Sequence, residues 1–153
     1  MNNLLSGRRP AEWQVLAEVV HSQLRRAIYL GDMPHTWIGS EYARAIFGML
    51  MHEGDDRLRL SPGAPPSWVS GDGLSVGDLP TAYGKLTLSA RQDGDTLRIV
   101  LGPGLRKDTA LEVTWPNRRR PTRVTVDGKV RSDFTADGIR TEHPFREIVA
   151  QWR

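Results

Sequence analysis

The segment YGKLTLSARQDGDTLRIVL, residues 83–101, decides the fold class of this chain. Leu86, Leu88 and Ala90 alternate with polar residues, which is the period of a β-strand with one buried face. A second apolar run follows at residues 97–101, and the Asp93-Gly94 pair between the two runs is typical of a two-residue hairpin turn. We therefore predict an antiparallel hairpin at the centre of a β-domain.

Further strand signals follow at regular spacing toward the C-terminus. Residues 111–115 and 123–126 alternate apolar and polar residues and predict two further strands, and the Asp127-Gly128 pair predicts a second hairpin. Apolar residues near the C-terminal end complete the series: Phe134, Ile139, Ile148, Ala150 and Trp152. Short strands separated by turns predict a small antiparallel β-sandwich over residues 83–153.

The sequence changes character on the N-terminal side of this region. Residues 61–82 (SPGAPPSWVSGDGLSVGDLPTA) are rich in proline and glycine, and they predict an irregular crossing with one short extended piece near residues 74–76. The alternation of arginine and leucine at residues 57–60 indicates a short strand just before it. Residues 55–82 are therefore assigned as a connection.

Two amphipathic helices are expected before this connection. The first spans residues 10–30, and the second spans residues 41–52 with Ser40 as its N-cap. The stripe of the first helix is Trp13, Leu16, Ala17, Val20, Leu24, Ala27 and Ile28. Two helices with one apolar face each cannot bury both faces by packing on each other alone. The predicted fold is thus α+β, with an N-terminal helical pair (residues 1–54) followed by the β-sandwich.

Charge does not favour a nucleic-acid partner. The chain has 153 residues, a pI near 9.7 and a net charge of only +3, because 21 basic residues are interspersed with 18 acidic ones. The single tight basic run, Arg118-Arg119-Arg120, lies where a turn is expected. We favour a solvated loop there over binding of phosphate or an acidic glycan.

Several features that would indicate an export route or a redox site are missing from this sequence. It has no apolar run of bilayer length and no signal-peptide core at its N-terminus, so we expect no membrane partner and a cytoplasmic location for the chain as it stands. It has no cysteine, and hence neither disulfides nor thiolate metal ligands.

The polar residues do not form a recognisable catalytic set. Hydrolysis of a glycosidic bond uses two carboxylates about 5–9.5 Å apart. Four aspartates instead precede glycines, which is typical of turns: Asp72, Asp93, Asp127 and Asp137. The four histidines show no metal-ligand spacing: His21, His35, His52 and His143. We expect no catalytic residue, no metal and no cofactor.

One segment, GDMPHTWIGSEY at residues 31–42, concentrates side chains that bind sugars. An indole ring such as that of Trp37 stacks on the apolar face of a sugar, while imidazole and carboxylate groups bind its hydroxyls. The alternative is structural: Trp37 fills an apolar groove, and Asp32 and Ser40 cap the helix ends.

The order of elements resembles the C-terminal end of bacterial six-hairpin glycosidases. The resemblance runs from about Arg9 to Trp152 through a helix, GDMPHTWIGSEY, a second helix, a PGAPPSWV-type loop, LPTAYGKLTLSAR and a late β-domain. In those enzymes an (α/α)6 barrel performs catalysis and a small β-sandwich follows it. The resemblance implies that residues 10–53 correspond to the last barrel helices, with the loop at residues 32–41 near the barrel rim.

The same resemblance implies His35, Trp37 and Glu41 as substrate-binding residues. It also implies that the chain is not a complete enzyme, because most of the barrel, including the region of its central acid, has no counterpart in this sequence.

Three functions remain open from the sequence. The first is a non-catalytic C-terminal module, related to glycoside hydrolases, that supports or completes a carbohydrate-active barrel. The second is a free-standing carbohydrate-binding module that uses Trp37, Trp68 or Trp115 as a stacking platform. The third is a homodimeric interaction domain whose helical stripes cover each other across a two-fold axis.

Overall fold

A computed structural model describes residues 36–153 of the chain, with side chains from Gly39 onward. The described part contains two helices, α3 (Thr36–Leu50) and α4 (Pro66–Val69). Ten strands accompany them: β1 (Met51–Glu53), β2 (Leu58–Leu60), β3 (Leu74–Thr81), β4 (Gly84–Asp93), β5 (Thr96–Leu101), β6 (Leu111–Thr114), β7 (Arg123–Val126), β8 (Lys129–Arg131), β9 (Gly138–Thr141) and β10 (Glu147–Gln151). The predicted helix over residues 10–30 lies outside the described residues.

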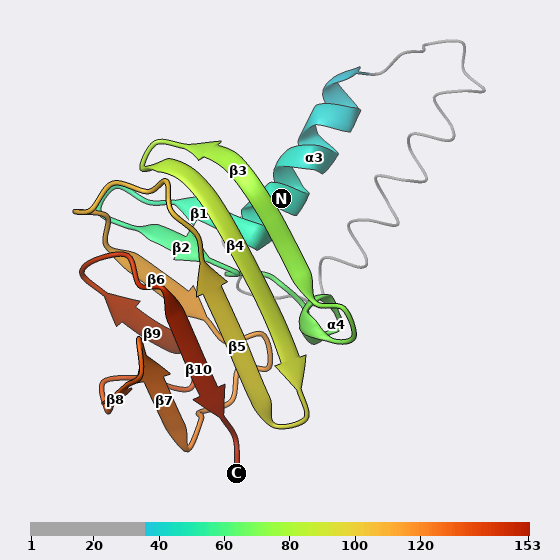
Figure 1. Cartoon of the computed structure of the whole chain (residues 1–153). Helices are drawn as coiled ribbons and strands as arrows, with labels where there is room; N and C mark the ends of the chain where they lie inside the picture. Colours follow the sequence, from blue (N-terminus) through green and yellow to red (C-terminus); the bar gives the residue numbers. More distant parts are fainter. Residues whose placement is uncertain (1–35) are drawn as a thin grey trace.

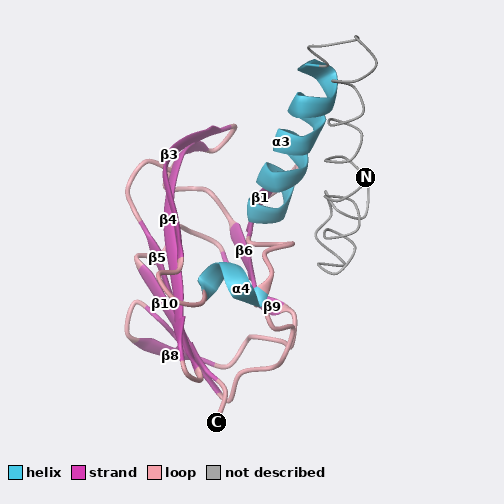
Figure 2. Cartoon of the chain, turned by 90° about the vertical axis from the view of Figure 1, so that its right-hand side faces the viewer, coloured by secondary structure: helices cyan, strands magenta, loops and turns pink. Residues whose placement is uncertain are grey.

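The strands form two sheets in a β-sandwich-like arrangement (Figure 1). Sheet A has four strands in the order β1-β2-β6-β9, and sheet B has six in the order β3-β4-β5-β10-β7-β8. Figure 2 shows the two layers edge-on, with α4 along their side and α3 projecting beyond them from the start of β1. The prediction of an α+β chain with a sandwich-like β-domain is confirmed.

The core lies between the sheets and follows the strand alternation that the sequence shows. Sheet A contributes Leu58, Leu60, Leu111, Val113 and Ile139. Sheet B contributes Leu86, Leu88, Ala90, Leu97, Ile99, Leu101, Val124, Val126, Ile148 and Ala150. Because side chains alternate across a strand, burying these residues places their polar neighbours on the outer faces of both sheets.

The sandwich is not wholly antiparallel, which corrects the prediction. Strands β2 and β6 run parallel, with Leu58 opposite Leu111 and Leu60 opposite Val113. Between them the chain builds β3, β4 and β5 in the other sheet and then returns to sheet A in the original direction. Parallel pairing requires such a long crossover, and an alternating sequence does not reveal the direction of its partner.

The segment from residue 51 to residue 82 contributes more to the sheets than the sequence indicated. The strand expected at residues 57–60 is present as β2, but β1 joins it in sheet A and β3 is eight residues long. A shift of register between Val76 and Leu79 interrupts β3, and Asp78 adopts a positive φ of 50° there. This bulge, together with Gly77 and Pro80, hides the strand from simple period-two analysis.

The two predicted hairpins both form, with one adjustment. Asp127 and Gly128 make the two-residue turn between β7 and β8, both with positive φ. In the β4–β5 hairpin, Asp93 is still paired with Thr96, so the turn residues are Gly94 and Asp95, one position later than predicted. Gly94 adopts a positive φ of 55° at the first position of that turn, a conformation that glycine takes without steric cost.

The predicted bounds of the second helix were also wrong at both ends. α3 begins at Thr36, so Ser40 lies inside the helix and is not its N-cap. It ends at Leu50 because Met51 pairs with Leu60 as the first residue of β1. An interior glycine such as Gly39 costs a helix only about 1 kcal/mol, which the remaining turns offset.

Gly138 allows β9 to approach β6, which gives a first prediction. A Cβ at this position would lie 2.0 Å from the carbonyl oxygen of Val113. Gly138→Ala should therefore reduce the free energy of unfolding by about 3 kcal/mol, measured by urea denaturation.

Gly77→Ala is the matched control, because a Cβ at Gly77 in β3 would meet no atom within 4 Å. Equal unfolding midpoints for the two variants would contradict this account of the β6–β9 contact.

Candidate functional site

The end of α3 is joined to the sandwich without a linker, and this joint organises the surface around it. Leu50 is the last helical residue and Met51 the first of β1. The backbone N–H of Ser61 donates to the Leu50 carbonyl (2.6 Å), and that of Gly63 donates to the Met49 carbonyl (3.0 Å). The segment after β2 thus satisfies carbonyls that a helix C-terminus leaves without intrahelical partners.

Side-chain packing reinforces the joint. Leu50 is buried in the main core, while Met49 and Ala45 form a second buried cluster against Trp68 of α4. Ala45 and Met49 are one helical turn apart, so they lie on the same face of α3. Trp68 also packs on the main core, and its side chain therefore links the helix to that core.

A shallow groove lies beside this joint, with space of about 550 Å³. We call it the α3–α4 groove; its lining residues are Ile46, Phe47, Leu50, Ser67, Trp68, Ser70, Asp72, Gly73 and Leu74. Phe47 is 45% exposed, the greatest exposure of a large apolar side chain in the described part of α3. The apolar part of the lining comes mainly from α3, and the polar part comes from α4 and the turn before β3.

The groove was not predicted as a site, although one signal in the sequence marks it. Pro65-Pro66 precedes Trp68, and Pro66 is the first residue of α4. Proline suits the first turn of a helix because it lacks an N–H and has a fixed φ. Reading this dipeptide as a helix start would have placed Trp68 on a short helix in the connection.

Of the three predicted substrate-binding residues, Glu41 is the one whose side chain the structure describes. His35 lies outside the described residues, and the described side chains do not include that of Trp37, whose backbone is helical. Glu41 is half-buried in α3 and forms an ion pair with Arg44 (3.5 Å). Residues 36–41 are therefore part of a helix and not of the interhelical loop expected there, and the lining of the α3–α4 groove does not include Glu41.

Trp115, one of the three proposed stacking platforms, is excluded by burial. Its side chain is fully buried, and its indole nitrogen donates to the Thr135 carbonyl (3.1 Å). Trp152 meets it edge-on, with ring centroids 6.0 Å apart. Trp68 is left as the predicted platform whose described side chain lines an open groove.

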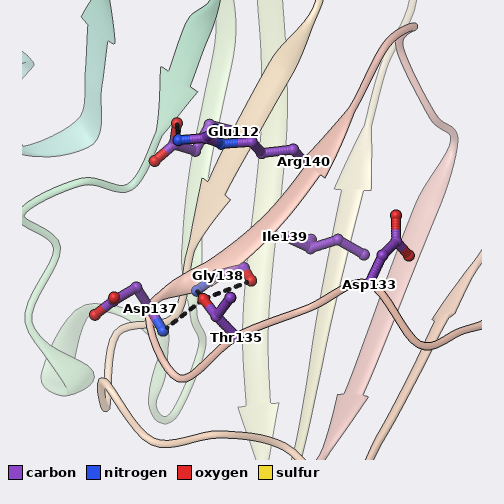
Figure 3. Close-up of a pocket in the computed structure, with 7 residues that line it drawn as sticks. All are labelled: Glu112, Asp133, Thr135, Asp137, Gly138, Ile139 and Arg140. Atoms are coloured by element: carbon purple, nitrogen blue, oxygen red, sulfur yellow. Dashed lines mark hydrogen bonds and ion pairs between the residues drawn. The ribbon is translucent and has the colours of Figure 1, made fainter.

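A second, polar pocket of about 390 Å³ lies by β9 (Figure 3). Its lining residues are Glu112, Asp133, Thr135, Asp137, Gly138, Ile139 and Arg140. Three carboxylates line one pocket here, which makes it the natural place to look for acid–base chemistry.

Two of the three carboxylates of the polar pocket, those of Glu112 and Asp133, are paired with arginines. Glu112 forms an ion pair with Arg140 (3.2 Å) and lies 3.8 Å from Arg59, all three in register across sheet A. Asp133 accepts two hydrogen bonds from the Arg131 guanidinium. The hydrogen bond and positive charge of Arg131 hold the pKa of Asp133 below its ordinary value, which suits an ion pair and not a general acid.

Asp137 occupies the turn before β9, as its sequence position predicted. Its backbone N–H donates to the Thr135 hydroxyl (3.1 Å), and its carbonyl accepts from the Trp115 backbone N–H (2.9 Å). In Figure 3 its side chain points away from that of Asp133. We therefore assign the polar pocket a structural role.

The predicted solvated loop at residues 118–120 is more ordered than expected. Arg118 is half-buried, adopts a φ of 52° and donates to the Pro62 carbonyl; burial lowers its pKa, and the charge of Asp137 opposes that effect. Arg120 stacks over the Phe134 ring at 5.4 Å. Arg118 and Arg120 therefore connect this loop to Pro62 and Phe134, and the run is not only a solvated turn.

Within residues 36–153, no group of three or more His, Cys, Asp or Glu side chains is arranged to hold a metal ion. Neither α3 nor α4 has the length and apolar character needed to cross a membrane.

Trp68 provides a test of the α3 joint. Trp68→Ala removes the ring that Ala45 and Met49 pack against, so the free energy of unfolding should fall by about 2–3 kcal/mol. Amide hydrogen exchange should also quicken in residues 45–50. Val130→Ala, at a position 65% exposed on β8, is the control; similar exchange in both variants would show that Trp68 does not hold the helix.

The Arg131–Asp133 pair predicts a specific pH response. Arg131→Gln should raise the pKa of Asp133 toward its ordinary value, measured by carboxyl NMR titration. Since the folded-state pKa is lowered, the stability from this pair is present above the unfolded-state pKa and is lost as the pH falls through the folded-state pKa. Both side chains are partly exposed, so the effect on stability should be small. An unchanged pKa in the variant would contradict the assignment, and Arg140→Gln is the control.

No family model matches this chain, and no curated protein matches it.

Proposed function

We propose that the chain is a non-catalytic C-terminal module related to glycoside hydrolases, which supports or completes a carbohydrate-active barrel. The observation that carries this proposal is the linkerless joint of α3 to β1, with an apolar helix face left partly open beside it. The resemblance in the order of elements supplies the identity of the partner, an (α/α)6 barrel.

A module that supports other helices must hold its own helix in a fixed direction. Here the peptide from Leu50 to Met51 passes from helix to strand with no intervening residue. Two backbone hydrogen bonds to the helix end, each worth about 0.5–1.5 kcal/mol, add to the packing of Trp68 on Met49. Together these contacts fix the axis of α3 relative to the sheets.

The side chains of α3 are apolar on more than one face. Ala45 and Met49 face Trp68, whereas Ile46 and Phe47 face the groove. A helix with apolar residues around much of its circumference is typical of the interior of a larger assembly. This distribution favours further helices packing on α3, as the end of a barrel would require.

The described carboxylates support the non-catalytic part of the proposal. Those of the polar pocket form ion pairs with arginines or occupy a turn, and they sit in the sandwich rather than beside α3. An acid–base pair for hydrolysis needs one protonated and one free carboxylate across an accessible cleft. The geometry of this pocket does not favour one protonated and one ionised carboxylate facing each other.

Phe47 gives the direct test. Phe47→Asp places a charge on the exposed apolar face of α3, so binding to a purified (α/α)6 barrel domain of a six-hairpin glycosidase should weaken at least tenfold by calorimetry. Val130→Asp, which changes an apolar residue that is 65% exposed on β8, should bind like the unaltered chain. Equal binding by Phe47→Asp, or turnover of aryl glycosides by the purified chain alone, would contradict the proposal.

Variants of Trp68 and Phe47 test the two rival functions, which are carbohydrate binding and homodimer formation. If Trp68 is a sugar-stacking platform, Trp68→Phe should retain binding to neutral oligosaccharides, while Trp68→Ala should lose it. If α3 is instead the interface of a homodimer, sedimentation should show a dimer that Phe47→Asp dissociates. The direct connection of α3 to β1 described above favours the support of a barrel over both sugar binding by Trp68 and homodimer formation.

A further inference from the structure

The outer face of sheet B carries a polar groove at the end of the molecule away from α3. Two depressions, of about 480 and 590 Å³, share Asp93 and Thr96 and so form one continuous feature. Its lining residues are Arg91, Asp93, Gly94, Asp95, Thr96, Arg98, Thr122, Arg123, Gln151 and Arg153. Figure 1 shows this region at the β4–β5 hairpin and the C-terminus, with α3 at the opposite end.

The strand registers place these side chains in two rows. Arg91 of β4 lies directly opposite Arg98 of β5, with their neighbours Ala90 and Leu97 buried in the core. In the next row Gln151 of β10 lies opposite Thr96 on one side and Arg123 on the other. Because the inward neighbours are fixed by the core, all these side chains are held on the same outer face.

The opposed arginines are the unusual feature. Like charges directly across two strands destabilise a sheet. Arg98 is partly compensated by an ion pair with Glu147, and Arg153 by Asp95 at 3.3 Å. Among the described residues, the side chains of Arg91 and Arg123 form neither a hydrogen bond nor an ion pair. The groove thus holds two uncompensated guanidinium groups, one in each row.

We propose that this groove binds an acidic oligosaccharide, with its carboxylates on Arg91 and Arg123. A guanidinium group binds a carboxylate through two parallel hydrogen bonds, and an anion beside Arg91 would also offset its repulsion with Arg98. Between the two arginines, Thr96 and Gln151 offer neutral donors and acceptors at the spacing of a sheet, which suits sugar hydroxyls.

The composition of the groove disfavours nucleic acid. Asp93 and Asp95 would repel a strand that carries a charge on every residue, and the described lining contains no aromatic ring for base stacking. The same carboxylates accept hydrogen bonds from hydroxyl groups. The ligand is therefore expected to carry widely spaced charges on a hydroxyl-rich chain.

The test is an NMR titration of the full chain at low salt with trigalacturonic acid, maltotriose and inorganic phosphate. Trigalacturonic acid should shift the amides of residues 91–98 and 122–123 and bind at least about tenfold more tightly than maltotriose, its neutral counterpart. Equal binding of maltotriose would overturn the proposal, and so would phosphate binding as tightly as the oligosaccharide. Tighter binding of a single-stranded DNA oligonucleotide would also overturn it.

Substitutions locate the site. Arg91→Gln and Arg123→Gln should each weaken the binding of trigalacturonic acid about tenfold. Arg146→Gln is the matched control, because this exposed arginine lies just before β10, at the end of that strand away from Gln151. Unchanged affinity in both test variants, each confirmed as folded by its spectrum, would refute the assignment. The support role of α3 does not depend on this result.

Discussion

The burial of apolar side chains between sheets A and B is the interaction on which the rest of the structure depends. Each long strand points alternate residues into the same layer, and Leu58, Leu111, Leu97 and Ile148 are completely inaccessible there. At about 25 cal/mol per Å² of apolar surface, such burial is the dominant favourable term in folding. Since the alternation is strict, the core also determines which residues must face outward.

This alternation determines which side chains the outer faces of the two sheets expose. On sheet A the outward residues include Arg59, Glu112 and Arg140, which form a mixed-charge row that largely neutralises itself. On sheet B, Arg98 pairs with Glu147, whereas the side chain of Arg91 directly opposite it has no such partner among the described residues. Two faces of one sandwich, built by the same periodicity, thereby differ in their capacity to bind an anion.

The connection between the sandwich and α3 fixes the direction of the helix relative to the sheets. The helix end is held by the backbone of the 61–63 segment and by Trp68, so the apolar residues of α3 are presented at a fixed angle to the sheets. The proposed role as a support for barrel helices and the proposed acidic-glycan groove use opposite ends of the molecule. One end supplies rigidity to a neighbouring domain, and the other offers a polar surface to solvent.

The sequence by itself determined the local elements of this protein. The alternation around Leu88, the Asp127-Gly128 turn and the apolar run near Ile148 predicted strands and a sandwich, because periodicity and turn chemistry are properties of neighbouring residues. Only the tertiary structure decided the parallel β2–β6 pair, the placement of Trp68 against Met49 and the meeting of Arg91 with Arg98. These contacts join residues whose pairing depends on how the chain crosses between sheets, and no local pattern specifies that path. The helical start at Thr36 also replaced the cap expected at Ser40, and Glu41, the predicted substrate-binding residue with a described side chain, pairs with Arg44.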